Sequence, residues 1–431
     1  TLMAADSAVM VIDASKGVEA QTIKLFKVCV MRHIPIFTFI NKMDRDARDT
    51  FELLDDIETV LGIKTCPVNW PIGSGKEFKG VYDRKTKIVS TFQAISTGGA
   101  KKAEETDYHI DDEALKKLVG PYLFDQFNEE IELIDGATEE MDIEKVRAGE
   151  LSPVFFGSAL NTFGIEQFLN YFLKMTTPPI GRNSSEGIID PVTEPFSAFV
   201  FKIQANMNKA HRDRIAFMRI CSGKFEAGME VYHAASKRKI KLSQPQQLMA
   251  QDRKIVDEAY AGDVIGVFDP DLFSIGDTLT TGGKKFEYEG IPTFAPEHFC
   301  RVVQLNSMKR KQFVKGVTQI AQEGAIQIFQ EYTAGLSEII VGVVGVLQFD
   351  VLKYRLENEY GCEIRLEPIP YNYIRWVKDP TIDVTKLKRV SDVKKVKDMK
   401  GNPLLLFANE WVIDQVLQHN EGLELEEFRK N

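Results

Sequence analysis

The chain has 431 residues and a formal net charge of −9 at pH 7, with 44% apolar and 27% charged side chains. This composition excludes a disordered or fibrous protein, and the length predicts about two to four domains. The five cysteines are scattered without metal-ligand spacing, which predicts free thiols, a cytoplasmic location and no metal site. No apolar run approaches about 18 residues, and no signal peptide is visible, so no membrane association is expected.

The first part of the chain alternates apolar strand patterns with helical ones. Strands are predicted at residues 8–13, 34–40 and 153–156, and helices at residues 18–32, 47–61 and 165–175. Continuous apolar strands that alternate with helices are typical of a doubly wound parallel sheet. We therefore expect an α/β domain over residues 1–181.

Asn41, Lys42, Met43 and Asp44 follow the strand at residues 34–40 and form an N-K-x-D motif. Guanine presents two adjacent donors, N1–H and the exocyclic amine, and the Asp44 carboxylate can accept both as a charge-assisted pair. Adenine lacks this pair and would leave the carboxylate unmatched. We expect Asn41 to bridge the loops of the pocket and the Lys42 stem to lie along the base.

A second loop of small residues, with Ser158, Ala159 and Leu160, follows the strand at residues 153–156. Such a loop lets backbone N–H groups approach the guanine O6. A four-residue motif alone is also compatible with an ordinary turn, because Asn and Asp are common turn formers. Ligands of open α/β sheets bind at the carboxyl ends of strands, so the two loops together predict a GTP or GDP site.

Residues 71–77 look like a phosphate-binding loop but do not match its pattern. G-x-x-x-x-G-K-[ST] requires Gly and Ser or Thr where the chain has Trp70 and Glu77, and G-K-[ST] occurs nowhere else. No D-x-x-G precedes the first strand. The sequence therefore contains the base-recognition half of a guanine-nucleotide site and lacks the triphosphate half.

About residues 63–150 separate the two base loops as an insertion. Residues 101–150 hold 16 acidic and 6 basic side chains, a net charge of −10. We expect a solvated helical insertion. The alternative is a docking site for a basic protein partner.

A linker rich in Pro, Gly and Ser spans residues 176–187, and short strand patterns separated by Gly turns follow it. These strands are predicted at residues 196–203, 215–220, 229–233, 255–260, 264–267 and 274–279. They indicate a β-barrel over residues 190–295.

The barrel is basic, because residues 196–245 hold 10 Lys and Arg against 3 Asp and Glu. This predicts contact with a nucleic-acid backbone, without base-specific readout. An ordinary charged barrel surface is the alternative. The candidate contacts are Arg212, Arg214, Lys237, Arg238 and Lys239.

Residues 296–431 are predicted to form an α+β domain. Strands at 299–305, 325–332, 338–344 and 363–368 and helices at 308–322 and 346–360 give the order β-α-β-β-α-β of a ferredoxin-like unit. Residues 370–431 are left unassigned, apart from a basic run at 385–400 and an apolar segment at 404–418.

Three segments resemble the bacterial release factor 3 family of translational GTPases: P-V-N-W-P-I-G at 67–73, F-V-F-K-I-Q-A-N-M at 199–207 and V-G-V-V-G-V-L-Q-F-D-V at 341–351. The resemblance covers essentially the whole chain. It matches Asn41, Lys42 and Asp44 to the base-specificity motif and residues 158–160 to the second base loop. Elongation factor G carries G-E-L-H where this chain has G-V-L-Q at 345–348.

The resemblance implies a ribosome-dependent GTPase of translation termination, which promotes release of class 1 release factors from the ribosome after peptide release. It implies that the catalytic residues, in the phosphate loop and switch regions, lie upstream of Thr1, so this chain is predicted not to hydrolyse GTP by itself. It implies Mg²⁺ as a cofactor of the complete protein. It also implies rRNA, ribosomal proteins and class 1 release factors as partners of a monomer, without DNA or membrane. The alternatives are an elongation factor G-like or ribosomal-protection GTPase, or a truncated, non-hydrolysing module that binds the ribosome.

Overall fold

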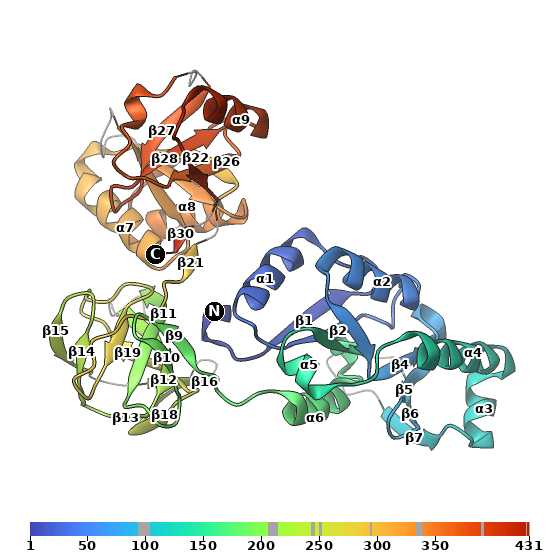
Figure 1. The fold of residues 1–431 in the computed structure, drawn as a ribbon. Coiled ribbons are helices and arrows are strands. Elements are labelled where there is room, and N and C mark those ends of the chain that lie inside the picture. The colour runs from blue at the N-terminus through green and yellow to red at the C-terminus, as the bar shows by residue number, and fades with distance from the viewer. Residues whose placement is uncertain are drawn as a thin grey trace. The chain divides into compact units, whose positions relative to one another are not determined.

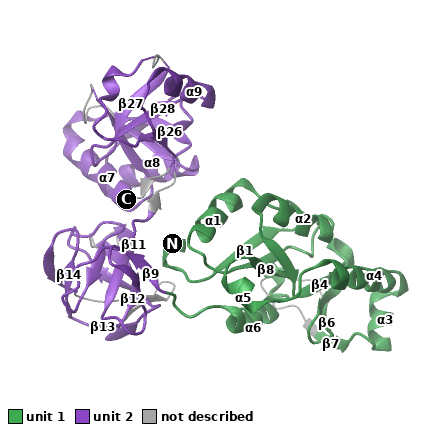
Figure 2. Cartoon of the chain, in the orientation of Figure 1, with its two compact units in different colours: residues 1–180 green, residues 181–431 purple. Residues whose placement is uncertain are grey.

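The computed structural model describes residues 1–93, 104–205, 214–242, 246–249, 252–293, 295–332, 339–388, 392–427 and 429–430. Two compact units divide the chain, residues 1–180 and residues 181–431 (Figure 2). Among the described helices, none combines the length and the apolarity that a bilayer span requires.

A four-stranded parallel sheet lies at the centre of the first unit (Figure 1). All three of its pairings are parallel. In spatial order its strands are β1 (Ala8–Asp13), β2 (Ile36–Asn41), β8 (Leu151–Phe156) and β3 (Lys64–Pro67). The three predicted strands are thus confirmed, and the short β3 adds a fourth.

Helices cover both faces of this sheet. Ile36 and Ile40 of β2 pack in one apolar cluster with residues of α1 (Ala20–Met31) and α2 (Thr50–Leu61). Phe37 and Phe39, which alternate with them and so point to the other face, pack against α6 (Ile165–Met175). The two base loops therefore start from strands that are fixed on both sides.

Helix α2 begins three residues later than predicted because of its N-cap. The Asp49 carboxylate accepts the N–H groups of Phe51 and Glu52 at 2.9 and 3.1 Å, which satisfies two of the first-turn donors. The helix ends at Gly62, whose φ of 73° is the left-handed conformation that a helix C-terminus favours.

The insertion is not the helical segment that was predicted. Its first half is an antiparallel sheet of β4 (Asn69–Ile72), β5 (Gly80–Asp83), β6 (Ile88–Gln93) and β7 (Glu104–His109). Its second half holds the helices α3 (Glu113–Val119), α4 (Pro121–Ala137) and α5 (Ile143–Arg147). Trp70 and Tyr82 of the sheet are buried with Phe127 of α4 in the same apolar cluster as residues of β2, α1 and α2, so the insertion packs onto the core of the α/β domain.

The second unit begins with the hairpin of β9 (Arg182–Ser184) and β10 (Gly187–Ile189), followed by an antiparallel sheet of eight strands. In spatial order these are β15 (Arg238–Lys241), β14 (Glu230–His233), β20 (Thr278–Thr280), β11 (Ser197–Ala205), β12 (Arg214–Ser222), β19 (Val264–Phe268), β16 (Gln246–Met249) and β17 (Asp252–Ile255). β13 (Lys224–Glu226) pairs with β18 (Glu258–Tyr260). One apolar cluster, which includes Val200, Met218 and Ile265, fills the interior.

The remaining part is built on a second sheet of eight strands. The predicted order is present as β22 (His298–Gln304), α7 (Arg310–Gln322), β23 (Gln327–Glu331), β24 (Ile339–Val343), α8 (Leu347–Glu359) and β25 (Ile364–Pro368). Residues 370–431, which sequence reasoning left unassigned, extend the same sheet from β23. They supply β27 (Val393–Lys397), β28 (Pro403–Phe407), β26 (Tyr373–Val377), β29 (Leu425–Glu426) and the helix α9 (Glu410–His419). β21 (Pro292–Thr293) pairs with β30 (Arg429–Lys430).

Candidate guanine-nucleotide site

The Asn41 side chain joins the two predicted base loops. Its Oδ1 accepts the backbone N–H of Lys42 at 2.8 Å and the backbone N–H of Ala159 at 2.8 Å. Gly157 reinforces the link, because its carbonyl accepts the Met43 N–H at 3.2 Å. The bridge predicted for Asn41 is therefore present in the structure.

Lys42 is held at the neighbouring strand end. Asp13 and Asn41 are register partners at the carboxyl ends of β1 and β2, so the Lys42 Nζ reaches the Asp13 Oδ2 at 2.5 Å. This hydrogen bond keeps the pKa of the Asp13 carboxyl well below its usual range, so the Asp13 carboxylate is charged at neutral pH. Lys42 also has a φ of 72°, a conformation that is uncommon outside glycine and is often found at functional sites.

Asp44 is partly exposed, whereas its neighbour Met43 is fully buried. The Asp44 Oδ2 accepts from the Asn161 Nδ2 at 3.1 Å, and the same amide donates to the Ser158 Oγ at 2.9 Å. Sequence reasoning did not find Asn161. The sequence feature that could have indicated Asn161 is its position directly after the small loop, where a tight turn brings the side chain back toward Asp44.

The second loop is compact. Ser158 and Phe163 exchange both backbone hydrogen bonds, at 3.1 and 3.0 Å, which closes the loop around Ala159 and Leu160. Ser158 is buried, whereas Ala159 and Leu160 are exposed. A Cβ on Gly157 would lie 2.6 Å from the Phe163 carbonyl oxygen and 2.8 Å from a ring carbon of Phe39, so this position requires glycine.

The described residues contain no group of three or more His, Cys, Asp and Glu arranged to hold a metal ion. The donor and acceptor set of the two loops does fit a guanine base. Within the described part of the chain Asp44 accepts a hydrogen bond from Asn161, and its side chain is partly exposed. Its carboxylate can therefore still accept from a ligand.

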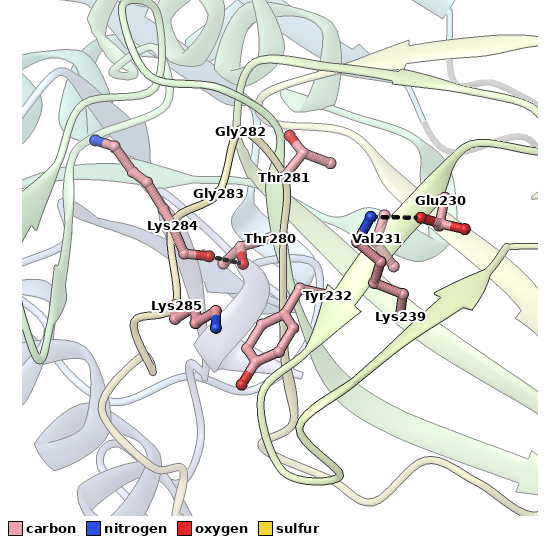
Figure 3. A pocket seen from close by; sticks show the side chains of 10 residues that line it. All are labelled: Glu230, Val231, Tyr232, Lys239, Thr280, Thr281, Gly282, Gly283, Lys284 and Lys285. Atoms are coloured by element: carbon pink, nitrogen blue, oxygen red, sulfur yellow. Dashed lines mark hydrogen bonds and ion pairs between the residues drawn. The ribbon is translucent and has the colours of Figure 1, made fainter.

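The basic residues of the barrel fall into two groups. Lys237, Arg238 and Lys239 are exposed at β15, the edge strand of the sheet, and Lys239 pairs with Glu230 at 2.9 Å. Beside this edge lies a hollow whose wall includes Tyr232 and the segment with Lys284 and Lys285 (Figure 3). Cationic side chains thus line one end of the barrel.

Arg214 does not belong to this surface, and its prediction as an RNA contact is wrong. The residue is 5% exposed, and its Nε lies 2.7 Å from the Asp269 Oδ2. Its other nitrogens bond Asp271, Gln322 and the Phe273 carbonyl. The guanidinium is internal because this loop supplies the countercharge. Arg212 lies outside the described residues.

Three family models match successive parts of the chain. The elongation factor Tu GTP binding domain matches residues 1–178, and elongation factor G domain 2 matches residues 195–282. The C-terminal domain of class II release factor RF3 matches residues 288–417. The match at the C-terminal domain separates this chain from elongation factors that share the first two.

Curated relatives agree with that match. The peptide chain release factor 3 of Symbiobacterium thermophilum is 53% identical over 98% of this chain and 80% of its own length. The chain belongs to the peptide chain release factor 3 family. Family members from Gloeothece citriformis and Synechococcus elongatus are 48% and 49% identical over 99% of this chain, and over 78% and 76% of their own lengths. As a member of the release factor 3 family, the chain is a translation termination factor with a GTP-binding domain.

A solved structure from Thermus thermophilus shares the fold, with a TM-score of 0.64 at 20% identity. The similarity covers 87% of this chain and 56% of that one. The release factor 3 family and the GTP-binding model from residue 1 support GTPase activity. They do not support the prediction that this chain is inactive by itself.

Proposed function

We propose that the base of GTP or GDP binds between the loops that Asn41 and Ala159 join. Asp44 accepts the guanine N1–H and amine, while Asn161 holds the carboxylate from the other side. The loop at residues 158–160, whose Ser158 and Ala159 N–H groups are held by Phe163 and Asn41, lies against the O6 edge of guanine, and the Lys42 stem lies along the base. The observation that supports this most is the bridge between Asn41 and Ala159, because it sets Asp44 beside the second loop.

The division of labour that we propose follows the predicted domains. Residues 1–181, which include the insertion at 63–150, bind the nucleotide. The barrel at residues 190–295 contacts rRNA. Residues 296–431 lie near the decoding region of the small ribosomal subunit. The protein, with Mg²⁺ as its cofactor, hydrolyses GTP on the ribosome as a cytoplasmic monomer. It thereby promotes the release of class 1 release factors after the peptide has been released.

The exposed cations of β15 support the ribosomal part of this proposal. Arg238 lies on β15, the last strand at one side of the described sheet, and Lys237 lies in the turn before it. Both side chains are exposed, so a phosphate backbone can approach them. Lysine and arginine contacts to phosphate release counterions, so they make binding depend on salt.

Co-sedimentation of the full chain with bacterial ribosomes tests this part, at several salt concentrations. We expect Lys237→Ala with Arg238→Ala to weaken binding and to lower the salt dependence by about one unit of slope for each phosphate that is no longer neutralised. Lys353→Ala, an exposed lysine of α8, is the matched control and should bind like the unmodified chain. Equal binding by all three proteins would refute the assignment of β15 to rRNA.

A further inference from the structure

Asn69 lies at the start of the insertion, yet its side chain bonds to the strand that carries the second base loop. Its Oδ1 accepts the Phe156 N–H at 2.7 Å, and its Nδ2 donates to the Phe156 carbonyl at 3.2 Å. The amide thus pairs with both backbone groups of the last residue of β8, as a neighbouring strand would. Gly157 and the small loop follow directly. Asn69 is fully buried, so these bonds do not compete with water.

The orientation of the Asn69 amide is fixed by a chain of polar groups behind it. The Asp83 carboxylate can only accept, and it accepts from the Gln167 Nε2 at 3.0 Å and from the Tyr171 hydroxyl at 2.9 Å. The Gln167 Oε1 therefore accepts from the Asn69 Nδ2, at 2.7 Å. Consequently the Asn69 Oδ1 must face the Phe156 N–H. Asp83, on β5 of the insertion, sets the geometry at the end of β8.

The insertion also contacts the first base loop. The Gly75 N–H donates to the Met43 carbonyl at 2.8 Å, in the middle of the N-K-x-D motif. The Trp70 ring lies 5.4 Å from the Phe156 ring, and its Nε1 donates to Glu130 of α4 at 2.8 Å. The insertion thus bonds to the first base loop and to the strand end that carries the second, and Trp70 connects its acidic helix α4 to the same apolar cluster.

We propose that the insertion positions both base loops, with Asn69 as the main positioning residue. Guanine-nucleotide affinity then depends on a segment that does not touch the base. This inference rests on the proposed base site. It gives the insertion a role in nucleotide binding, in place of the separate, solvated segment that its charge suggests.

A purely structural role for Asn69 makes a different prediction. In that case any substitution that loosens the insertion would weaken the base loops to the same extent. Thr91 provides the comparison, because it is buried in β6 of the insertion and its Oγ1 donates to the Thr106 carbonyl at 3.0 Å. Thr91 bonds within the insertion sheet, away from both base loops.

The test measures backbone hydrogen exchange and GDP affinity in the full chain for Asn69→Ala, Gln167→Ala and Thr91→Ala. Asn69→Ala deprives two buried backbone groups of Phe156 of their partner, so we expect exchange at residues 157–159 and GDP dissociation each to rise about tenfold or more. Gln167→Ala should raise exchange at the same residues by a smaller factor. Thr91→Ala should raise it only in β6 and β7.

An even rise across residues 1–180 in Asn69→Ala, or an equal effect of Thr91→Ala on residues 157–159, would overturn the proposal. If Asn69→Ala does not fold, Gln167→Ala decides by the same criterion. The two readouts separate the two proposals. Unmodified chain that fails to bind GDP refutes the base site, whereas the exchange pattern still shows whether Asn69 holds the loop.

Discussion

Ala159 donates its backbone N–H to the Asn41 Oδ1 at 2.8 Å, although the two residues are 118 positions apart in the chain. The bond joins the carboxyl ends of β2 and β8, which are paired neighbours in the sheet. A loop that is fixed in this way costs less conformational entropy to order when a ligand binds. The two base loops therefore behave as one preformed unit.

Gly157 should tolerate no side chain. Gly157→Ala places a methyl group 2.6 Å from the Phe163 carbonyl oxygen, and the loop must shift to relieve the overlap. We expect a loss of about 1–3 kcal/mol in the free energy of unfolding, measured by urea denaturation. Gly136→Ala is the control, because its Cβ would meet nothing within 4 Å in a helix, and it should be neutral or stabilising. Equal stability of both variants would contradict the close packing of this loop.

The elements that could be predicted from the sequence are mainly those whose side chains are buried along their whole length. Parallel strands covered on both faces appear as unbroken apolar runs, which is why β2 and β8 could be placed from the sequence. β1 has a similar apolar run, although its Val9 and Val11 are exposed. The N-K-x-D motif was found because each of its residues has a distinct chemical role. Asn41 does bridge the loops, as its residue type and position suggested.

The unpredicted part depends on partners that are distant in the sequence. Nothing in the local sequence marks Asn69 or Asn161 as special, because their partners Phe156 and Asp44 are brought to them only by the fold. Arg214 was assigned to the surface because its neighbours are basic, whereas its countercharge, Asp269, lies 55 positions later. The insertion was expected to be a solvated helical segment, and residues 101–150 marked it by their charge. Helices α3, α4 and α5 do lie there, but the charge gave no sign of the sheet of β4 to β7 that comes before them.

Substitution of Arg214 should lower the stability of the fold far more than the same substitution of Arg238. Arg214→Met leaves the buried Asp269 carboxylate without its cation, so we expect a loss of about 3–5 kcal/mol in the free energy of unfolding. Arg238→Met removes an exposed cation and should change stability by less than about 0.5 kcal/mol. Thermal unfolding of both variants measures the difference. A stable Arg214→Met protein would show that the ion pair is dispensable.

Cys66 should make the fold sensitive to alkaline pH. Burial raises the pKa of its thiol from 9.0 to about 11. Below about pH 9 both the folded and the unfolded chain keep the proton, so Cys66 has no effect on stability there. Between about pH 9 and 11 the unfolded chain loses the proton first, and the free energy of unfolding falls by up to about 3 kcal/mol.

Urea denaturation at pH 8 and pH 10.5 measures this loss in the unmodified chain and in Cys66→Ala. We expect the variant to lose less stability than the unmodified chain between the two pH values, because it lacks one of the groups that titrate. The buried thiol should also resist alkylation at pH 8 in the folded protein. An identical alkaline loss in both proteins would mean that Cys66 titrates normally.

Asp44→Asn should change the base preference rather than abolish binding. The amide replaces one acceptor of the carboxylate by a donor, which suits xanthine, whose C2 carries an oxygen where guanine has an amine. We expect the ratio of xanthosine to guanosine diphosphate affinity to rise at least about 100-fold, measured by competition. Asp46→Asn, two residues along and outside the N-K-x-D motif, is the control. An unchanged ratio would place the base away from Asp44.

The most direct test of the central claim is a titration of the full chain with GDP and with ADP, alongside Asp44→Ala. The account predicts that GDP binds in clear preference to ADP and that Asp44→Ala removes this preference. Equal affinity for the two nucleotides, or a preference that persists in Asp44→Ala, would contradict guanine recognition by this site.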